Sequence, residues 1–275
     1  MTILEAVILG ILQGVTEFLP VSSSGHLALM QHFLGLREPQ LFFDVMLHLG
    51  TLGAVIIAYK NSIRELAGAS LSAVINLQFY RRPISTIKGS TDLKLICFIL
   101  LGSVPTGAIA IAFKPQLEAL FVKPTVVAMM LITTGVILQL PRFRRNPVDG
   151  DCPVRFWHSP LIGIAQGLAI TPGISRSGAT ISLALLLGSA PKQAARFSFL
   201  LSIPAILGAV LLKLKDVASI SVSPMAVAFG TLTAFAVGYI ALRVLLAVLD
   251  RGKFTGFSYY CFALGMGVLI FRMLS

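Results

Sequence analysis

The feature that most constrains this fold is a series of apolar stretches, each long enough to cross a lipid bilayer. Crossing requires roughly 17–25 mostly apolar residues, and backbone groups in lipid must bond internally, which favours helices. Only 12% of the 275 residues are charged and the mean hydropathy is +0.89. The sequence therefore predicts an all-α polytopic membrane protein with six transmembrane helices. The stretches lie at about 43–59, 92–113, 122–140, 196–213, 224–249 and 257–274.

A 17-residue segment occurs twice, at residues 10–26 and 163–179, and the copies match without a gap at seven positions. About one or two matches would arise by chance in a chain of this composition. Polar residues interrupt both copies, and such breaks at corresponding positions of two halves indicate a site between the halves. The matches are Gly10/Gly163, Ile11/Ile164, Gln13/Gln166, Gly14/Gly167, Ser22/Ser175, Ser24/Ser177 and Gly25/Gly178.

The two regions that hold these copies, 1–36 and 160–188, are broken by Pro and by Ser-Gly turns. Each half-segment is too short to cross alone, so we expect two re-entrant helix hairpins that enter the membrane and return. Residues 1–140 then form a first repeat and 160–275 a second, each a hairpin followed by three spans, within one membrane domain. Three spans between the hairpins invert the second repeat.

Basic residues orient this arrangement. The loops 60–91, 141–159, 189–196 and 250–256 carry thirteen of the 22 Lys and Arg, and such loops are typically cytoplasmic. Both termini and the first hairpin are then expected to lie outside. We expect the loop 60–91 to contain an interfacial helix. The net charge of +11 is explained by these cytoplasmic loops. Nucleic-acid binding is not expected, because the sequence contains no soluble basic domain that could perform it.

The N-terminus begins apolar without a basic segment or small-residue cleavage site, so we expect no removable signal peptide. Cys97, Cys152 and Cys261 are far apart and predict neither a disulfide framework nor a metal site. The sequence leaves the oligomeric state open, a homo-oligomer included.

The first repeat copy carries an acidic centre. Glu17 follows Gln13 by four positions, so both lie on one helical face, and an intramembrane carboxylate indicates function. His26 ends the turn that contains Ser22, Ser23 and Ser24, and imidazole can act as acid, base or nucleophile. The alternatives are a structural Glu bonded to the turn and a packed His. Asp44 and His48, four apart, are expected to be supporting or structural.

The second copy carries a basic counterpart. Arg176 has a planar fork that fits phosphate oxygens, and Ser175, Ser177 and Thr180 add hydroxyls. A turn that leads into a helix N-terminus also favours an anion. The alternative is a structural Arg176–Glu17 pair, which could open for substrate.

An Arg and Ser anion cradle facing a Glu, Ser and His cluster suggests phosphoryl transfer in the membrane. An anion-coupled transporter is equally compatible with these residues, whereas a purely structural protein leaves Glu17 and Arg176 unexplained. The chain has no P-loop, zinc spacing or cofactor fingerprint.

The motif from Gln13 and Glu17 through Phe18-Leu19-Pro20-Val21-Ser22-Ser23-Ser24-Gly25-His26, with Pro172-Gly173-x-Ser175-Arg176-Ser177-x-x-Thr180, resembles the undecaprenyl-diphosphate phosphatase family of bacitracin-resistance proteins. The resemblance implies six spans plus two re-entrant hairpins in inverted repeat, in the bacterial inner membrane. It further implies removal of the terminal phosphate from C55-isoprenyl diphosphate, which yields the monophosphate carrier lipid of wall synthesis. A polyprenyl-phosphate flippase that uses the same anion site is the alternative.

The resemblance assigns catalysis to Glu17, Ser23, His26 and Arg176. Either Ser23 or His26 would attack phosphorus, with Glu17 as base or orienting group. The family accepts Glu or Gln at the first motif position, and Gln13 removes one carboxylate here, so no metal ligand set is predicted. Mg²⁺ or Ca²⁺ could arrive with the diphosphate. The expected substrate-binding residues are Gln13, Ser22, Ser24, Ser175, Ser177 and Thr180.

Overall fold

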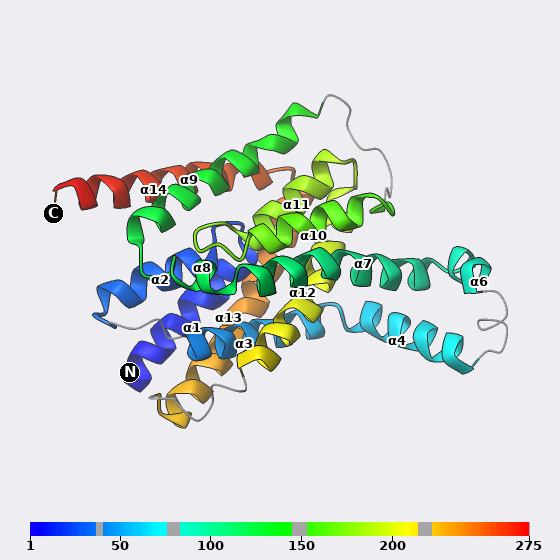
Figure 1. Cartoon of the computed structure of the whole chain (residues 1–275), viewed down its shortest axis with the longest axis horizontal. Coiled ribbons are helices and arrows are strands. Elements are labelled where there is room, and N and C mark those ends of the chain that lie inside the picture. Colours follow the sequence, from blue (N-terminus) through cyan, green and yellow to red (C-terminus); the bar gives the residue numbers. More distant parts are fainter. Residues whose placement is uncertain (37–40, 76–82, 145–152, 214–221, 275) are drawn as a thin grey trace.

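The computed structural model describes residues 1–36, 41–75, 83–144, 153–213 and 222–274, and every regular element in these ranges is a helix (Figure 1). Five of these helices are long and apolar enough to cross a membrane. A sixth span results when α3 and α4, bent by 81° at their junction, are counted together. The predicted all-helical, multi-pass membrane protein is therefore confirmed. The helices are α1 Ile3–Phe18, α2 Ser23–Phe33, α3 Leu41–Ala58, α4 Lys60–Ile75, α6 Pro83–Gly89, α7 Thr91–Ala112, α8 Lys114–Glu118, α9 Pro124–Gln139, η1 Leu140–Phe143, α10 His158–Leu168, α11 Arg176–Leu186, α12 Pro191–Lys213, α13 Pro224–Asp250, η3 Phe254–Gly256 and α14 Phe257–Leu274.

Each predicted span coincides with one helix: α3, α7, α9, α12, α13 or α14. The largest difference is at α12, which begins at Pro191 rather than at 196, because proline suits the first turn of a helix. The segment 60–91 contains α4, as expected, although its position at a membrane interface stays a prediction. Cys152 and the basic residues Arg81, Arg82 and Arg145 lie outside the described residues.

Two helix pairs, α1 with α2 and α10 with α11, fold back at the predicted breaks. Their members are 16, 11, 11 and 11 residues long, shorter than a bilayer-crossing helix. In Figure 1 the free ends of α1 and α2 lie on the same side as the two termini, and those of α10 and α11 on the opposite side.

Glycines of the repeat let these helix pairs approach their neighbours closely. A Cβ added at Gly10 would lie 2.5 Å from the Gly230 carbonyl oxygen of α13, and one added at Gly163 would lie 2.0 Å from the Gly102 oxygen of α7. The helix α1 thus packs on α13 and α10 on α7. Each hairpin therefore packs on the second span of the other half, and close backbone approach is how membrane helices commonly associate.

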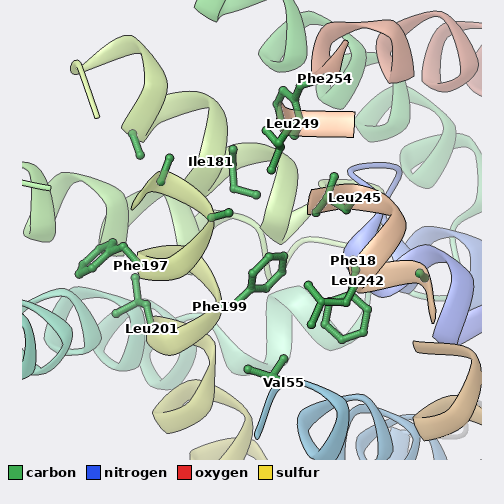
Figure 2. Close-up of a cluster of buried hydrophobic side chains, with 14 of the residues drawn as sticks. Phe18, Val55, Ile181, Phe197, Phe199, Leu201, Leu242, Leu245, Leu249 and Phe254 are labelled. Carbon is green, nitrogen blue, oxygen red and sulfur yellow. The ribbon is translucent and has the colours of Figure 1, made fainter. Parts of the chain in front are cut away.

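An apolar core fixes the end of α1 (Figure 2). The Phe18 ring is fully buried and meets the Phe199 ring of α12 edge to face, with 5.6 Å between centroids. Val55 of α3 and Leu242 of α13 complete this part of the cluster. Aromatic pairs of this geometry are favourable beyond their buried area, so the core anchors the residue that follows Glu17.

Candidate active site

The turns of the two helix pairs meet inside the protein. A Cβ added at Gly25 would lie 3.0 Å from the Gly173 Cα, so the two backbones touch with no side chain between them. The end of α1 and the starts of α2 and α11 are thereby brought together. Residues that are about 150 positions apart in the sequence can therefore share one site.

The first turn is shaped by Ser22. This residue has φ +70°, a left-handed conformation that is uncommon outside glycine. Its Oγ accepts a hydrogen bond from the Gly25 N–H at 3.2 Å and so caps α2. The capped helix starts with Ser23, whose hydroxyl faces Glu17.

The second turn is built in the same way and held more tightly. Ser175 Oγ accepts from the Gly178 N–H at 3.0 Å and caps α11. Thr134 of α9 clamps the turn, because its Oγ1 donates to the Gly173 carbonyl at 2.8 Å and accepts from the Ser175 N–H at 2.9 Å. Gly173 has φ +100°, and a Cβ there would lie 2.4 Å from the Val127 oxygen, so only glycine fits.

Glu17 is the centre of the site. Its side chain is 4% exposed, and one carboxylate oxygen accepts a hydrogen bond from Arg176. The other oxygen accepts from Ser23 Oγ at 2.6 Å and from Gln13 Nε2 at 3.0 Å. Three donors converge on one carboxyl group, an arrangement that suits its ionised form. The repeat therefore correctly predicted that the acidic and basic copies meet.

A cavity of about 600 Å³ opens beside this centre. Glu17, Ser23, Ser24, Ser175 and Arg176 lie on its polar wall. Its remaining length is mostly apolar and runs between α7, α8 and α12, where Ile111, Ile206, Leu211 and Leu212 are among the lining residues. The cavity thus has a polar wall at Glu17 and Arg176 and a mostly apolar lining elsewhere, with Lys114 and Glu118 of α8 as further charged residues.

Arg176 has unused bonding capacity beside this cavity. One of its terminal nitrogens is buried and has no hydrogen-bond partner among the described residues, while the other is paired with Glu17. An unpaired buried donor carries a cost of about 1–3 kcal/mol. Because Arg176 is also the first residue of α11, backbone dipoles add positive potential at this position. The positive potential of the site is therefore only partly balanced by Glu17.

The other predicted binding residues divide into two groups. Ser24 and Ser175 line the cavity, and Ser175 also caps α11.

The others lie off the cavity wall. Ser22 is a helix cap, and Ser177 contacts the Glu17 backbone oxygen at 3.5 Å. Thr180 donates to the Arg176 carbonyl at 2.8 Å and lies 2.5 Å from the Ser198 hydroxyl of α12. These residues hold the turns in place, and Gln13 holds Glu17.

His26 does not face the acidic centre. Its Nδ1 lies 2.8 Å from the Ser22 carbonyl oxygen and its Nε2 lies 2.8 Å from the Tyr260 hydroxyl of α14. The two rings stack with an interplanar angle of 7°. His26 is not among the described residues that line the cavity, so both ring nitrogens serve contacts on the far side of the turn.

His48, for which a supporting or structural role was expected, lies on the cavity wall. Its Nε2 is 3.4 Å from the Glu17 carboxylate. Asp44, one helical turn earlier, also lines the cavity and accepts a hydrogen bond from Gln31 at 2.6 Å. The spacing of four residues indicated a shared face, but it did not indicate that this face turns toward Glu17.

The fold and this cluster define a polytopic membrane protein with a buried polar site built from a carboxylate, a serine and a guanidinium. The sequence model of the bacitracin resistance protein BacA matches residues 6–267, and the chain belongs to that family. It is 47% identical to an undecaprenyl-diphosphatase of Desulfosudis oleivorans, over 95% of this chain and 96% of the relative. Undecaprenyl-diphosphatases of Desulforapulum autotrophicum and Carboxydothermus hydrogenoformans are 42% and 41% identical, over 97% and 98% of this chain and 97% of each relative.

Proposed function

We propose that this protein hydrolyses undecaprenyl diphosphate to undecaprenyl phosphate and inorganic phosphate in the cavity beside Glu17. The product is the carrier lipid of cell-wall synthesis, and its recycling confers bacitracin resistance. The observation that carries the proposal is the convergence of Ser23 and Arg176 on Glu17 at the polar wall of a mostly apolar cavity. The names of the relatives favour hydrolysis over transport of the intact lipid.

The substrate lies with its isoprenyl chain along the apolar wall between α7 and α12. Its diphosphate reaches the polar end, where the free nitrogen of Arg176 binds a phosphate oxygen. Ser24, Ser175 and backbone N–H groups at the starts of α2 and α11 add further donors. Binding of phosphate by Arg176 loosens its pair with Glu17 and leaves that carboxylate free to act as a base.

Ser23 is the nucleophile in this mechanism. Its Oγ attacks the terminal phosphorus while its proton passes to Glu17, only 2.6 Å away, and the bridging P–O bond breaks. Water then attacks the phosphoserine, the Ser23 oxygen recovers a proton from Glu17, and phosphate leaves. A serine activated by an adjacent base is a common solution for group transfer. In this scheme His26 positions the turn through Ser22 and Tyr260.

The described residues include no group of three or more His, Cys, Asp and Glu side chains placed to hold a metal ion. We therefore assign any Mg²⁺ or Ca²⁺ to the diphosphate itself, whose charge it would offset as it enters. Oxygen atoms of Glu17 and Ser23 are the donors that such an ion would meet at the polar end.

The topology proposed with this function has two re-entrant hairpins in inverted repeats, 1–140 and 160–275, within the bacterial inner membrane. The reciprocal packing of α1 on α13 and α10 on α7 supports the repeat. The cavity then opens to the outer face, and both termini lie outside. Cysteines introduced at Lys88, Arg155 and Met273 of a variant without native thiols test it in intact cells. A membrane-impermeant reagent should label position 273 only, and labelling at 155 would overturn the orientation.

Phosphate release from undecaprenyl diphosphate by purified protein in detergent tests the activity. Glu17→Gln should abolish release, whereas Glu65→Gln, which removes an exposed carboxylate 3.9 Å from Arg196, should retain it. Movement of intact lipid across vesicles by wild-type protein without phosphate release would contradict the phosphatase and support the transporter.

A further inference from the structure

We propose that His48 is a further catalytic residue, which protonates the oxygen that leaves the attacked phosphorus and then takes a proton from the hydrolytic water. This inference rests on the proposed phosphatase function and adds the group that handles the second proton of that reaction. Ser23 and Glu17 account for one proton only.

The position of His48 relative to the reacting groups carries the proposal. Its Nε2 lies 3.4 Å from a Glu17 carboxylate oxygen, the same oxygen that accepts the Ser23 hydroxyl at 2.6 Å. The His48 side chain is 28% exposed and lies on the cavity wall. His48 and Ser23 thus contact the same Glu17 oxygen and line the same cavity, in which the attacked phosphorus would lie.

The hydrogen bond on the other ring nitrogen fixes the tautomer. His48 Nδ1 is 2.7 Å from the Asp44 backbone oxygen, and a carbonyl oxygen can only accept, so Nδ1 carries a proton. Nε2 is then the nitrogen that gains or releases a proton. It lies 3.4 Å from the Glu17 carboxylate, and His48 lines the cavity, so this nitrogen is placed to exchange a proton with a bound phosphate.

His26 offers no such nitrogen. Both of its ring nitrogens are already engaged, by the Ser22 carbonyl and the Tyr260 hydroxyl, and it lies off the cavity wall. Of the two histidines near the site, His48 is thus the one placed for proton transfer to substrate.

The proton balance closes with His48 in this role. When the Ser23–phosphorus bond forms, the Ser23 proton moves to Glu17, the bridging P–O bond breaks, and the proton on His48 Nε2 moves to the leaving oxygen. Water then attacks phosphorus and gives its proton to His48, while the Ser23 oxygen recovers its proton from Glu17. The cycle ends with both side chains restored and one water consumed.

Other charged groups around His48 set its surroundings. Glu17 faces it from α1, Arg176 lies beyond Glu17 on α11, and Asp44 lies on its own helix with its side chain bound by Gln31. Lys114 and Glu118 of α8 lie on the wall of the same cavity. The proposal predicts a pH dependence that follows His48 and disappears with it.

Two variants separate proton transfer from hydrogen bonding. His48→Gln places an amide donor near the Nε2 position, and His48→Asn keeps a donor near Nδ1 for the Asp44 oxygen, but neither side chain titrates. His32→Gln, an exposed histidine on α2, is the matched control. We expect both His48 variants to lower kcat at least tenfold with KM within about threefold, and the control to match wild type.

The decisive measurement is the pH profile of kcat for phosphate release from undecaprenyl diphosphate. Wild type should lose activity on the alkaline side as His48 loses its proton, and both variants should lack that limb. A wild-type profile without an alkaline limb, a limb that persists in the variants, or a His48→Gln variant within about threefold of wild-type kcat would each overturn the proposal. Should one variant fail to elute as a folded monodisperse protein, the other still decides. Absence of phosphate release by wild type would instead reject the proposed function.

Discussion

The two turns at the centre of this protein share a scaffold and differ in chemistry. In both, the first serine of Ser-x-Ser-Gly caps a helix through the glycine N–H, with distances of 3.2 and 3.0 Å. In both, the hydroxyl oxygens of the two motif serines lie close together: 3.4 Å separates Ser22 from Ser24, and 3.3 Å separates Ser175 from Ser177. The residue between them differs: it is Ser23 in one turn and Arg176 in the other, and both contact Glu17.

This difference assigns roles to the repeat. The matching residues build the turn, and the position that does not match delivers the functional group. Glu17 follows the same pattern, because its counterpart 153 residues later is Ile170. The two equivalent turns thus place one hydroxyl, that of Ser23, and one guanidinium, that of Arg176, against a single carboxylate.

The largest effect is expected at the position that differs. Ser23→Ala should reduce kcat about a thousandfold or more, with substrate binding largely intact, because it removes the attacking oxygen. Rapid-quench trapping with labelled diphosphate checks the intermediate. An acid-labile, base-stable phosphoenzyme that persists in Ser23→Ala but vanishes in His26→Ala would show that His26 is the nucleophile.

The equivalent position in the second turn should be sensitive to shape rather than charge. Arg176→Lys should lower kcat/KM about 10- to 100-fold, since lysine lacks the planar fork that fits phosphate oxygens. Arg142→Lys, at an exposed arginine that donates to Thr255, is the control and should match wild type. An Arg176→Lys enzyme within about threefold of wild type would refute this role.

The shared glycines should affect stability in both halves. Gly10→Ala and Gly163→Ala each force a Cβ into a backbone oxygen of the neighbouring helix, a change expected to cost roughly 1–3 kcal/mol. Thermal unfolding in detergent should show lower melting temperatures for both. Gly267→Ala, with no atom within 4 Å of the new Cβ, should behave as wild type. Equal stability of all three variants would mean that the close packing is not needed.

The smallest effect is expected at the caps. Ser22→Ala should cost about 1 kcal/mol of stability through the lost bond to Gly25, while kcat stays within about threefold of wild type. Because φ is +70° at this position, Ser22→Gly should recover part of that loss. A large fall in kcat with unchanged stability would show that Ser22 takes part in the reaction rather than in the structure of the turn.

Much of this structure could be predicted from the sequence. Hydropathy placed the six spans, and Pro20 and Pro172 with the serine runs placed the two breaks. The repeat alignment put the two serine turns at corresponding positions, and an Arg176–Glu17 pair was one of the alternatives that the sequence left open. These features depend on local composition and on spacing along the chain.

The remaining features depend on tertiary contacts that spacing does not encode. His26 is paired with Tyr260, 234 residues away, and this contact turns it from the cavity. His48 reaches Glu17 because α3 packs against both α1 and α13. Similarly, Thr134 clamps the second turn from another helix. No periodicity of α3 or α9 alone could indicate these partners.

The pairing of Glu17 with Arg176 has a consequence for synthesis of the chain. The two residues are 159 positions apart, so at 5–20 residues per second the ribosome makes Arg176 roughly 10–30 s after Glu17. A carboxylate without a partner is costly inside a bilayer. During that interval only neutral donors of the same segment, Gln13 and Ser23, can bind Glu17, so we expect the nascent N-terminal segment to stay partly hydrated until Arg176 is made.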